Sequence, residues 1–507
     1  MSAIAAITGP LPKAGVVVIA VLTASALIAG DRRLRAGSML GAVVLAPVLL
    51  LAAIWHSPQL RLVHRHPLLA LVGAVIAIAL LALASRWLGG RPAVFAPLAI
   101  AALPFRVPIQ AGGATSNLLV PLYLVVAAGS LAYIVPVLLG RARDPGGGTD
   151  PPAVRLLERL LAIYVVLYAV QAIYSPSFET ALQQMVFFYV PFALLYMLLR
   201  EVRWTRRLVR SAVRLAAVLA LAFAGLAFVE YATKTIILNP KLVVANDLHT
   251  YFTVNSVFFD PDIFGRFLAL VMILLACVLL FGRDRREQLA SAAVLAVLWV
   301  GLVLTLSRSS LAALLVGLGV LAAMRWKPSR ALVVAVVVVA LGAAAVALSP
   351  NTFGLNQGLN GASSGRGGLI SGGASLFADR PVWGFGSGSF VTEYRAHHNS
   401  GANTLSASHT IPITIAAEQG LIGEVAYIGL VLAAFACLLS RARGDPVRTA
   451  IAAAFIALAF HTLLYADFLE DPVTWALLGI GAALARDPLA EASAVPTPAG
   501  GLATAAA

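Results

Sequence analysis

Long apolar stretches alternate with short polar ones along most of the 507-residue chain. A membrane-spanning helix needs about 20 apolar residues, and the runs that reach or approach this length lie at 14–30, 38–55, 67–84, 118–139, 156–174, 180–199, 211–230, 262–281, 289–306, 309–324, 331–348, 418–439 and 449–467. Shorter runs occupy 93–104 and 473–485. Backbone polar groups cannot stay unpaired in hydrocarbon, and the alternating period of a barrel strand is absent. We therefore predict an all-α fold, a polytopic transmembrane helix bundle of about 13–15 spans.

Composition supports a membrane protein and excludes a soluble one. Hydrophobic residues make up 60% of the chain and charged residues 11%, with a mean hydropathy of +0.92. The two cysteines, Cys277 and Cys437, both lie in predicted spans, where a cysteine behaves as a small apolar residue. We therefore predict neither a disulfide nor a metal pair from them.

The net charge of +14 follows topology and does not require a nucleic-acid partner. Of the 36 Lys and Arg residues, 23 lie at Arg486 or in the short loops 31–37, 85–92, 140–155, 200–210, 282–288, 325–330 and 440–448. Cytoplasmic loops carry such an excess, so these loops are predicted inside and the 349–408 segment outside. The N-terminus is then outside and the C-terminus inside.

The chain divides into five predicted parts. An apolar scaffold covers 1–152, further helices cover 153–348, and a large extracytoplasmic loop rich in Gly, Ser and Asn covers 349–408. The last helices span 409–485, and an Ala/Pro/Thr/Gly tail without apolar period, predicted disordered, covers 486–507. Because long loops between helices are uncommon unless functional or disordered, the chemistry is expected near 349–408.

Three arginines stand at outward-facing ends of predicted helices or in the large loop: Arg266, Arg308 and Arg366. Ionisable groups near a membrane interior usually face a cavity and serve a site. A guanidinium matches phosphate oxygens with two parallel hydrogen bonds and stays protonated. Together the three suit a lipid-borne diphosphate. The alternative is that each snorkels to the interface or forms an ion pair with Asp260 or Asp262.

A histidine and a glutamate complete the candidate site. His409 stands where the large loop meets the next apolar run, and histidine can take a proton from an alcohol near neutral pH. Glu418 is predicted to orient His409, to bind an arginine, or to sit at the interface. The Gly384-x-Gly386-x-Gly388 run predicts turns with positive φ. The pair His397-His398 lacks a third ligand, so no metal is predicted.

Several segments together resemble the O-antigen ligase/O-antigen polymerase superfamily over about residues 255–440. They are Phe258–Arg266, Thr305–Leu314, Arg366 with Phe377–Phe390, and Ser408-His409 leading to Glu418–Gly423. The resemblance implies a metal-independent, cofactor-free, inverting glycosyltransferase of the GT-C type. Its donor would be a polyprenyl-diphosphate-linked glycan, its acceptor a glycan or lipid hydroxyl, and its place the outer face of the bacterial cytoplasmic membrane, among membrane lipids.

The resemblance also implies roles for individual residues. Arg308 and Arg366 would hold the diphosphate, with Arg266 as a third. His409 would activate the acceptor, with Glu418 assisting. Two positions depart from the family pattern, which often has Asn at each: Asp262, which could partly neutralise Arg266, and Thr410, which could alter acceptor positioning.

Other functions remain open at the level of sequence. A transporter or flippase of lipid-linked oligosaccharide would use the same arginines without needing His409. A structural partner in a polysaccharide export complex would have no transferase activity of its own. Between polymerase and ligase the sequence favours neither.

Overall fold

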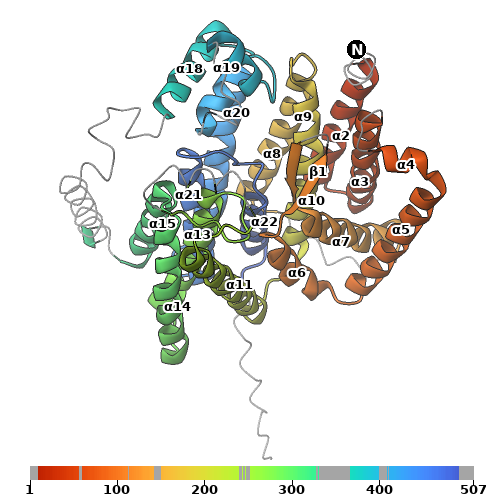
Figure 1. Cartoon of the computed structure of the whole chain (residues 1–507). Helices are drawn as coiled ribbons and strands as arrows, with labels where there is room; N and C mark the ends of the chain where they lie inside the picture. The colour runs from red at the N-terminus through yellow and green to blue at the C-terminus, as the bar shows by residue number, and fades with distance from the viewer. Residues whose placement is uncertain are drawn as a thin grey trace, which may run out of the picture.

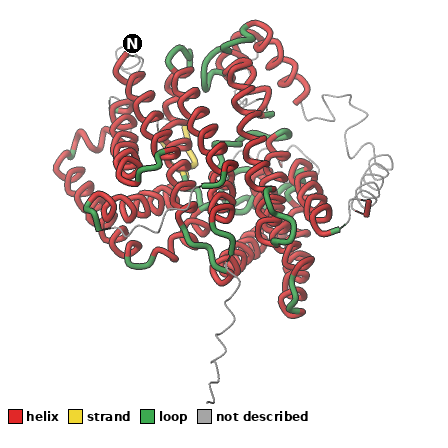
Figure 2. The backbone as a smooth tube through the Cα atoms, turned by 180° about the vertical axis from the view of Figure 1, so that it is seen from behind, coloured by secondary structure: helices red, strands yellow, loops and turns green. Residues whose placement is uncertain are grey.

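The computed structural model describes residues 9–55, 60–111, 114–141, 150–238, 243, 246, 252–326, 329–330, 366–398, 408 and 410–489. Helices make up most of this part of the chain (Figures 1 and 2), which confirms the predicted all-α bundle. Ten helical segments there are long and apolar enough to cross a membrane. They are α2 (Pro10–Ile28), α3 (Arg32–Ile54), α5 (Pro67–Gly89), α7 (Val120–Leu138), the α9–η3–α10 run (Phe178–Glu201), α11 (Arg206–Thr233), α13 (Pro261–Phe281), α14 (Arg285–Leu304), α15 (Arg308–Arg325) and α20 (Ile411–Leu439).

Three further helices match predicted runs. They are α8 (Pro152–Ala172), α21 (Pro446–Thr462) and α22 (Pro472–Arg486). The α9–η3–α10 run consists of α9 (Phe178–Gln184), the π-helix η3 (Met185–Tyr189) and α10 (Val190–Glu201). The predicted span 331–348 lies outside the described residues, as does the tail from 490 onward.

The short run predicted at 93–104 is the main departure from continuous helices. It forms a 3₁₀ turn, η2 (Pro92–Val94), and the eight-residue helix α6 (Phe95–Ala102). An antiparallel hairpin of β1 (Val107–Ala111) and β2 (Ala114–Leu118) follows. The hairpin is the one strand pair seen in the described ranges, and it lies among the helices (Figure 2). An eight-residue helix is only about 12 Å long, too short to cross a bilayer by itself.

An ion network, here called the arginine cluster, joins four helix ends. The buried Arg200 side chain forms ion pairs with Glu158, Asp150 (2.5 Å) and Glu201 (3.0 Å). Arg35 reaches Glu201 at 3.2 Å, and Arg486 reaches Asp150 at 2.7 Å. The cluster brings together the N-terminal ends of α3 and α8 and the C-terminal ends of α10 and α22, all in or beside loops that the charge pattern predicts in the cytoplasm.

Helix packing separates a buried centre from an exposed edge. Helix α13 packs against α14, α15 and α21, and α10 packs against α22. Small residues permit these contacts, since a methyl group on Gly479 would lie 2.8 Å from the Tyr196 carbonyl oxygen across the α10–α22 contact. Helix α5 packs mainly on α7 at the edge of the bundle (Figure 1), with only Ser85 and Leu88 buried. Its other apolar side chains suit contact with lipid.

The described part of the predicted large loop is mostly helical. It contains α18 (Arg366–Asp379) and α19 (Phe390–His398), which lie beside the first part of α20 (Figure 1). A small apolar core unites these three helices: Leu376, Phe385, Phe390, Tyr394 and Ala417. Helix α20 is kinked at Gly420, whose φ is +64°. Residues 366–398 therefore form a helical cap on α20.

Candidate functional site

Arg308 is presented by a short turn between α14 and α15, here called the serine turn (Thr305–Ser310). Ser307 is the N-cap of α15, and its hydroxyl accepts a hydrogen bond from the Ser310 N–H at 3.2 Å. Arg308 is the first residue of the helix, and its side chain is exposed. A helix N-terminus offers backbone N–H groups and the positive end of the helix dipole. An exposed guanidinium at that position favours an anion.

Asp262, the second residue of α13, orders the serine turn. One of its carboxylate oxygens accepts hydrogen bonds from the hydroxyls of Ser307 at 2.5 Å and Ser309 at 2.9 Å. The Ser310 hydroxyl donates to the Asp262 carbonyl at 3.2 Å. These contacts fix the backbone on both sides of Arg308. The aspartate that departs from the family pattern thus acts on the turn that carries Arg308.

The buried His461, on α21, completes the support of the serine turn. Its Nε2 lies 3.2 Å from the hydroxyl oxygens of both Ser309 and Ser310. Sequence reasoning missed this residue. The signal was present, because His461 is the one histidine of eight that falls inside a predicted apolar run, and ionisable residues there are functional-site candidates.

Asp260 caps the N-terminus of α13, next to the serine turn. Its carboxylate accepts hydrogen bonds from the N–H groups of Asp262 at 2.7 Å and Ile263 at 3.3 Å. Burial raises the pKa of the Asp260 carboxyl above its ordinary value, and the neighbouring Asp262 carboxylate raises it further. The N-terminus of α13 is therefore capped by Asp260 and contacts the serine turn through Asp262.

Arg266 is buried and bound to protein. Its side chain is 2% exposed, and Nη2 lies 2.7 Å from an Asp471 carboxylate oxygen. Nη1 donates to the carbonyls of Ala466 and Asp467 at 3.4 and 3.3 Å. The ion pair expected as the alternative to phosphate binding thus exists, with Asp471 as the partner in place of Asp260 or Asp262. The diphosphate contact of Arg266 stays a prediction.

Glu418 is buried under the cap. Its two carboxylate oxygens accept hydrogen bonds from the backbone N–H groups of Gly388 at 2.8 Å and Phe390 at 2.9 Å. Phe390 begins α19, so the carboxylate neutralises part of that helix N-terminus. The assistance to His409 predicted for Glu418 stays a prediction, while its observed contacts anchor the cap.

The glycine run before α19 forms the turns that the sequence predicts. Gly384, Gly386 and Gly388 have φ values of +66°, +102° and +76°. A methyl group on Gly384 would lie 2.3 Å from the Glu418 carbonyl oxygen, and one on Gly386 would lie 2.6 Å from Ser175 Cα. Positive φ and close backbone approach both require glycine here.

This loop docks on the kink of α20. The N–H groups of Phe385 and Gly386 donate to the carbonyls of Ala417 at 3.1 Å and Glu418 at 2.7 Å. In return, the Leu421 N–H donates to the Pro381 carbonyl at 2.7 Å. The loop therefore satisfies backbone groups that the kink removes from the helix.

Two predicted site residues are described only in part or not at all. Arg366 is the first residue of α18, and its side chain lies outside the described residues. His409 also lies outside them, between Ser408 and Thr410, and Thr410 is the N-cap residue of α20. The roles of both stay predictions. Within the described ranges, no three His, Cys, Asp or Glu side chains gather as a metal site.

The fold and the serine turn define a multi-pass membrane protein with an anion-favouring helix N-terminus. Residues 292–428 match the model of the family described as O-antigen ligase, so the predicted resemblance is confirmed over this segment. The match supports an O-antigen ligase-like membrane glycosyltransferase. The matched segment contains Arg308, Arg366, His409 and Glu418, and Arg266 precedes it. A search of curated proteins finds no match.

Proposed function

We propose that this protein transfers a glycan from a polyprenyl-diphosphate carrier to an acceptor hydroxyl at the outer face of the bacterial cytoplasmic membrane. One observation carries the proposal: Arg308, inside the segment that matches the O-antigen ligase family, is exposed at the start of helix α15. Its turn is held by Asp262 and His461 from outside that segment. A cation on an ordered helix N-terminus is suited to a diphosphate.

The reaction is a single displacement. The acceptor oxygen attacks the anomeric carbon of the donor sugar while the bond from that carbon to the diphosphate oxygen breaks, which inverts the configuration. The acceptor proton goes to His409, acting as general base. The leaving diphosphate keeps the bonding electron pair, and its growing charge is stabilised by Arg308 and Arg366.

Supporting roles follow from the contacts around these groups. Asp262 and His461 are positioning residues, because they act through the serine turn and hold Arg308 in place. Glu418 acts through the cap, whose first helix begins at Arg366. Arg266, on α13, is the third proposed cation, and its buried ion pair with Asp471 makes its contribution to diphosphate binding the smallest of the three. Positioning of charge within a fraction of an ångström matters for such catalysis.

The test is turnover by the purified protein in lipid nanodiscs, supplied with a polyprenyl-diphosphate-linked oligosaccharide and an acceptor glycan. We expect a new glycosidic bond and release of polyprenyl diphosphate, both lost in His409→Ala. Arg325→Ala, at the other end of α15 and exposed, is the matched control for Arg308→Ala. Product length separates a polymerase from a ligase.

Three outcomes oppose the proposal in different ways. Full transfer by His409→Ala removes the histidine from the chemistry. Movement of the lipid between leaflets without bond formation, unaffected by His409→Ala, indicates the flippase alternative. No transfer by the wild-type protein, with transfer restored only by other proteins of an export complex, indicates a structural partner.

A further inference from the structure

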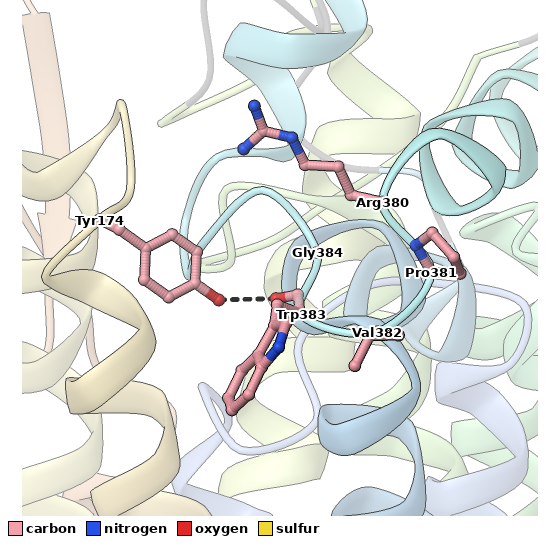
Figure 3. Close-up of a pocket in the computed structure, with 6 residues that line it drawn as sticks. All are labelled: Tyr174, Arg380, Pro381, Val382, Trp383 and Gly384. Carbon is pink, nitrogen blue, oxygen red and sulfur yellow. Dashed lines mark hydrogen bonds between the residues drawn. The ribbon is translucent and has the colours of Figure 1, made fainter.

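A cavity of about 500 Å³ lies where α18 ends and the glycine run begins. It is lined by Tyr174, which follows α8, and by the segment Arg380–Gly384 (Figure 3). In Figure 3 the Tyr174 hydroxyl points to the Trp383 carbonyl, and the Arg380 side chain extends above them. The volume is in the range of ordinary small-ligand sites. None of these residues belongs to the proposed catalytic group.

The walls of this cavity are fixed by backbone contacts. The Trp383 carbonyl accepts hydrogen bonds from the Tyr174 hydroxyl at 2.6 Å and from Gln171 Nε2 at 3.3 Å. The next residue, Gly384, is pressed against the Glu418 backbone. The Trp383 side chain nevertheless remains 56% exposed. A large aromatic ring is thus displayed from a rigid turn, which lowers the entropy lost when a ligand packs against it.

The side chains combine aromatic faces with a cation. Trp383 and Tyr174 are exposed, and the Arg380 guanidinium lies 4.5 Å from the centre of the Phe385 ring. A pyranose ring has an apolar C–H face and a rim of hydroxyls. Aromatic rings pack against such a face, while a guanidinium and a tyrosine hydroxyl bind such a rim. The chemistry of the cavity therefore matches sugar rings.

Helix α18 separates the cavity from one of the residues proposed to hold diphosphate. The helix has 14 residues and runs from Arg366 to Asp379, so it is about 21 Å long. We propose that the cavity binds sugar rings of the glycan substrate remote from the transferred bond and selects which glycan is used. Remote binding of this kind supplies energy for orienting the reacting groups. This inference rests on the proposed function.

A lipid headgroup is the competing occupant, because Trp and Tyr also gather at membrane interfaces. An interfacial anchor needs only a ring at the surface. Here Tyr174 and Arg380 line one cavity together with Trp383, and the Tyr174 hydroxyl is bonded to the Trp383 carbonyl (Figure 3). Polar side chains beside exposed rings in one cavity favour a saccharide.

The experiment measures binding apart from chemistry. The probe is a water-soluble oligosaccharide released by mild acid from the lipid-linked glycan of the native host, so it carries no diphosphate. It is titrated by calorimetry into the full-length protein in phosphatidylcholine nanodiscs. We expect Kd to rise at least tenfold in Trp383→Ala and in Arg380→Ala. Trp383→Phe, which keeps a ring, should recover most of the affinity.

Matched controls come from exposed residues of the same types. Trp299 on α14 is 48% exposed, and Arg395 on α19 is exposed, so Trp299→Ala and Arg395→Ala should bind as wild type does. Melting temperature monitors folding. If Trp383→Ala does not fold, Trp383→Phe and Arg380→Ala carry the test.

Several results would overturn the inference. These are an unchanged Kd in both cavity variants, no binding of the oligosaccharide by wild type, or binding of phosphatidylglycerol headgroups alone at this place. Transfer assays run in parallel separate the two claims. If the wild type transfers glycan and the cavity variants bind the oligosaccharide as tightly as the wild type does, only the cavity proposal fails. Oligosaccharide binding that depends on Trp383, without transfer, supports the cavity and removes the proposed reaction.

Discussion

The arginine cluster and the serine turn use charged residues in opposite ways. In the cluster, the Arg200 side chain is 1% exposed and is surrounded by Glu158, Asp150 and Glu201. At the serine turn, the carboxylate of Asp262 holds serine hydroxyls and Arg308 stays exposed. A buried arginine with carboxylates joins helices, whereas an exposed arginine on an ordered turn can meet a ligand.

Arg266 resembles the cluster more than the turn. Like Arg200, it is buried against a carboxylate, here Asp471. The comparison therefore predicts that Arg266 contributes more to stability than to diphosphate binding, although Arg266 and Arg308 both stand at outward-facing ends of predicted helices. Substitutions can break or sharpen this contrast.

The largest effect is expected at Arg200. Arg200→Ala leaves Glu158 and part of Asp150 as uncompensated charges in a buried place, which should lower the free energy of unfolding by about 3–5 kcal/mol. Denaturant or thermal unfolding in micelles measures this. Arg203→Ala, an exposed neighbour, is the control. Unchanged stability in Arg200→Ala would show that the arginine cluster does not hold the helices together.

Arg308→Ala should lower the transfer rate about 100-fold, or about 2.7 kcal/mol of transition-state stabilisation. The melting temperature should change by less than about 2 °C, because loss of an exposed side chain usually has little effect on stability. Arg308→Lys should keep part of the rate, since it retains charge without the planar fork. A large fall in melting temperature with normal turnover per folded molecule would show that Arg308 serves stability and not ligand binding.

Asp262→Ala removes the acceptor for two serine hydroxyls and should lower the transfer rate about tenfold, or about 1.4 kcal/mol. Asp262→Asn keeps an oxygen acceptor and should restore most of the rate. Turnover measured over a range of donor concentrations separates KM from kcat. If Asn fails to rescue, the carboxylate has a role beyond ordering the turn.

The smallest effect is expected when both partners of the buried Arg266–Asp471 ion pair are replaced. Arg266→Met combined with Asp471→Leu replaces an ion pair by apolar groups, which is often close to neutral. The double variant should fold within about 1 kcal/mol of wild type and keep most of its transfer rate. A stable but inactive double variant would place Arg266 with Arg308 as a diphosphate ligand.

Much of the helical architecture could be predicted because lipid imposes a length and a composition on each span. The runs at 262–281 and 309–324 correspond within a few residues to α13 and α15. The half-length helix α6 could not be distinguished from a full span, because a short apolar run has no period long enough to decide between them. The hairpin that follows α6 was not predicted either. The kink at Gly420 likewise depends on a loop distant in sequence.

The site shows the same division between local and distant causes. The exposed position of Arg308 follows from its own sequence, since Ser307 caps the helix beside it. The partner of Arg266 is Asp471, which lies two helices beyond the large loop, and nothing local to Arg266 indicates it. Glu418 was predicted to orient His409, to bind an arginine or to sit at the interface. Its contacts with Gly388 and Phe390 depend on how the cap docks, which its own sequence surroundings do not indicate.

The glycine turns of the cap have a consequence for how substrate preference can change over time. Gly384, Gly386 and Gly420 meet backbone atoms and tolerate no side chain, whereas Val382 and Trp383 point outward. In a saturation library over residues 380–390, survivors should retain Gly384 and Gly386 and diversify at Val382 and Trp383. An invariant scaffold with replaceable surface residues lets a lineage acquire a new sugar specificity without redesigning the membrane helices beneath it.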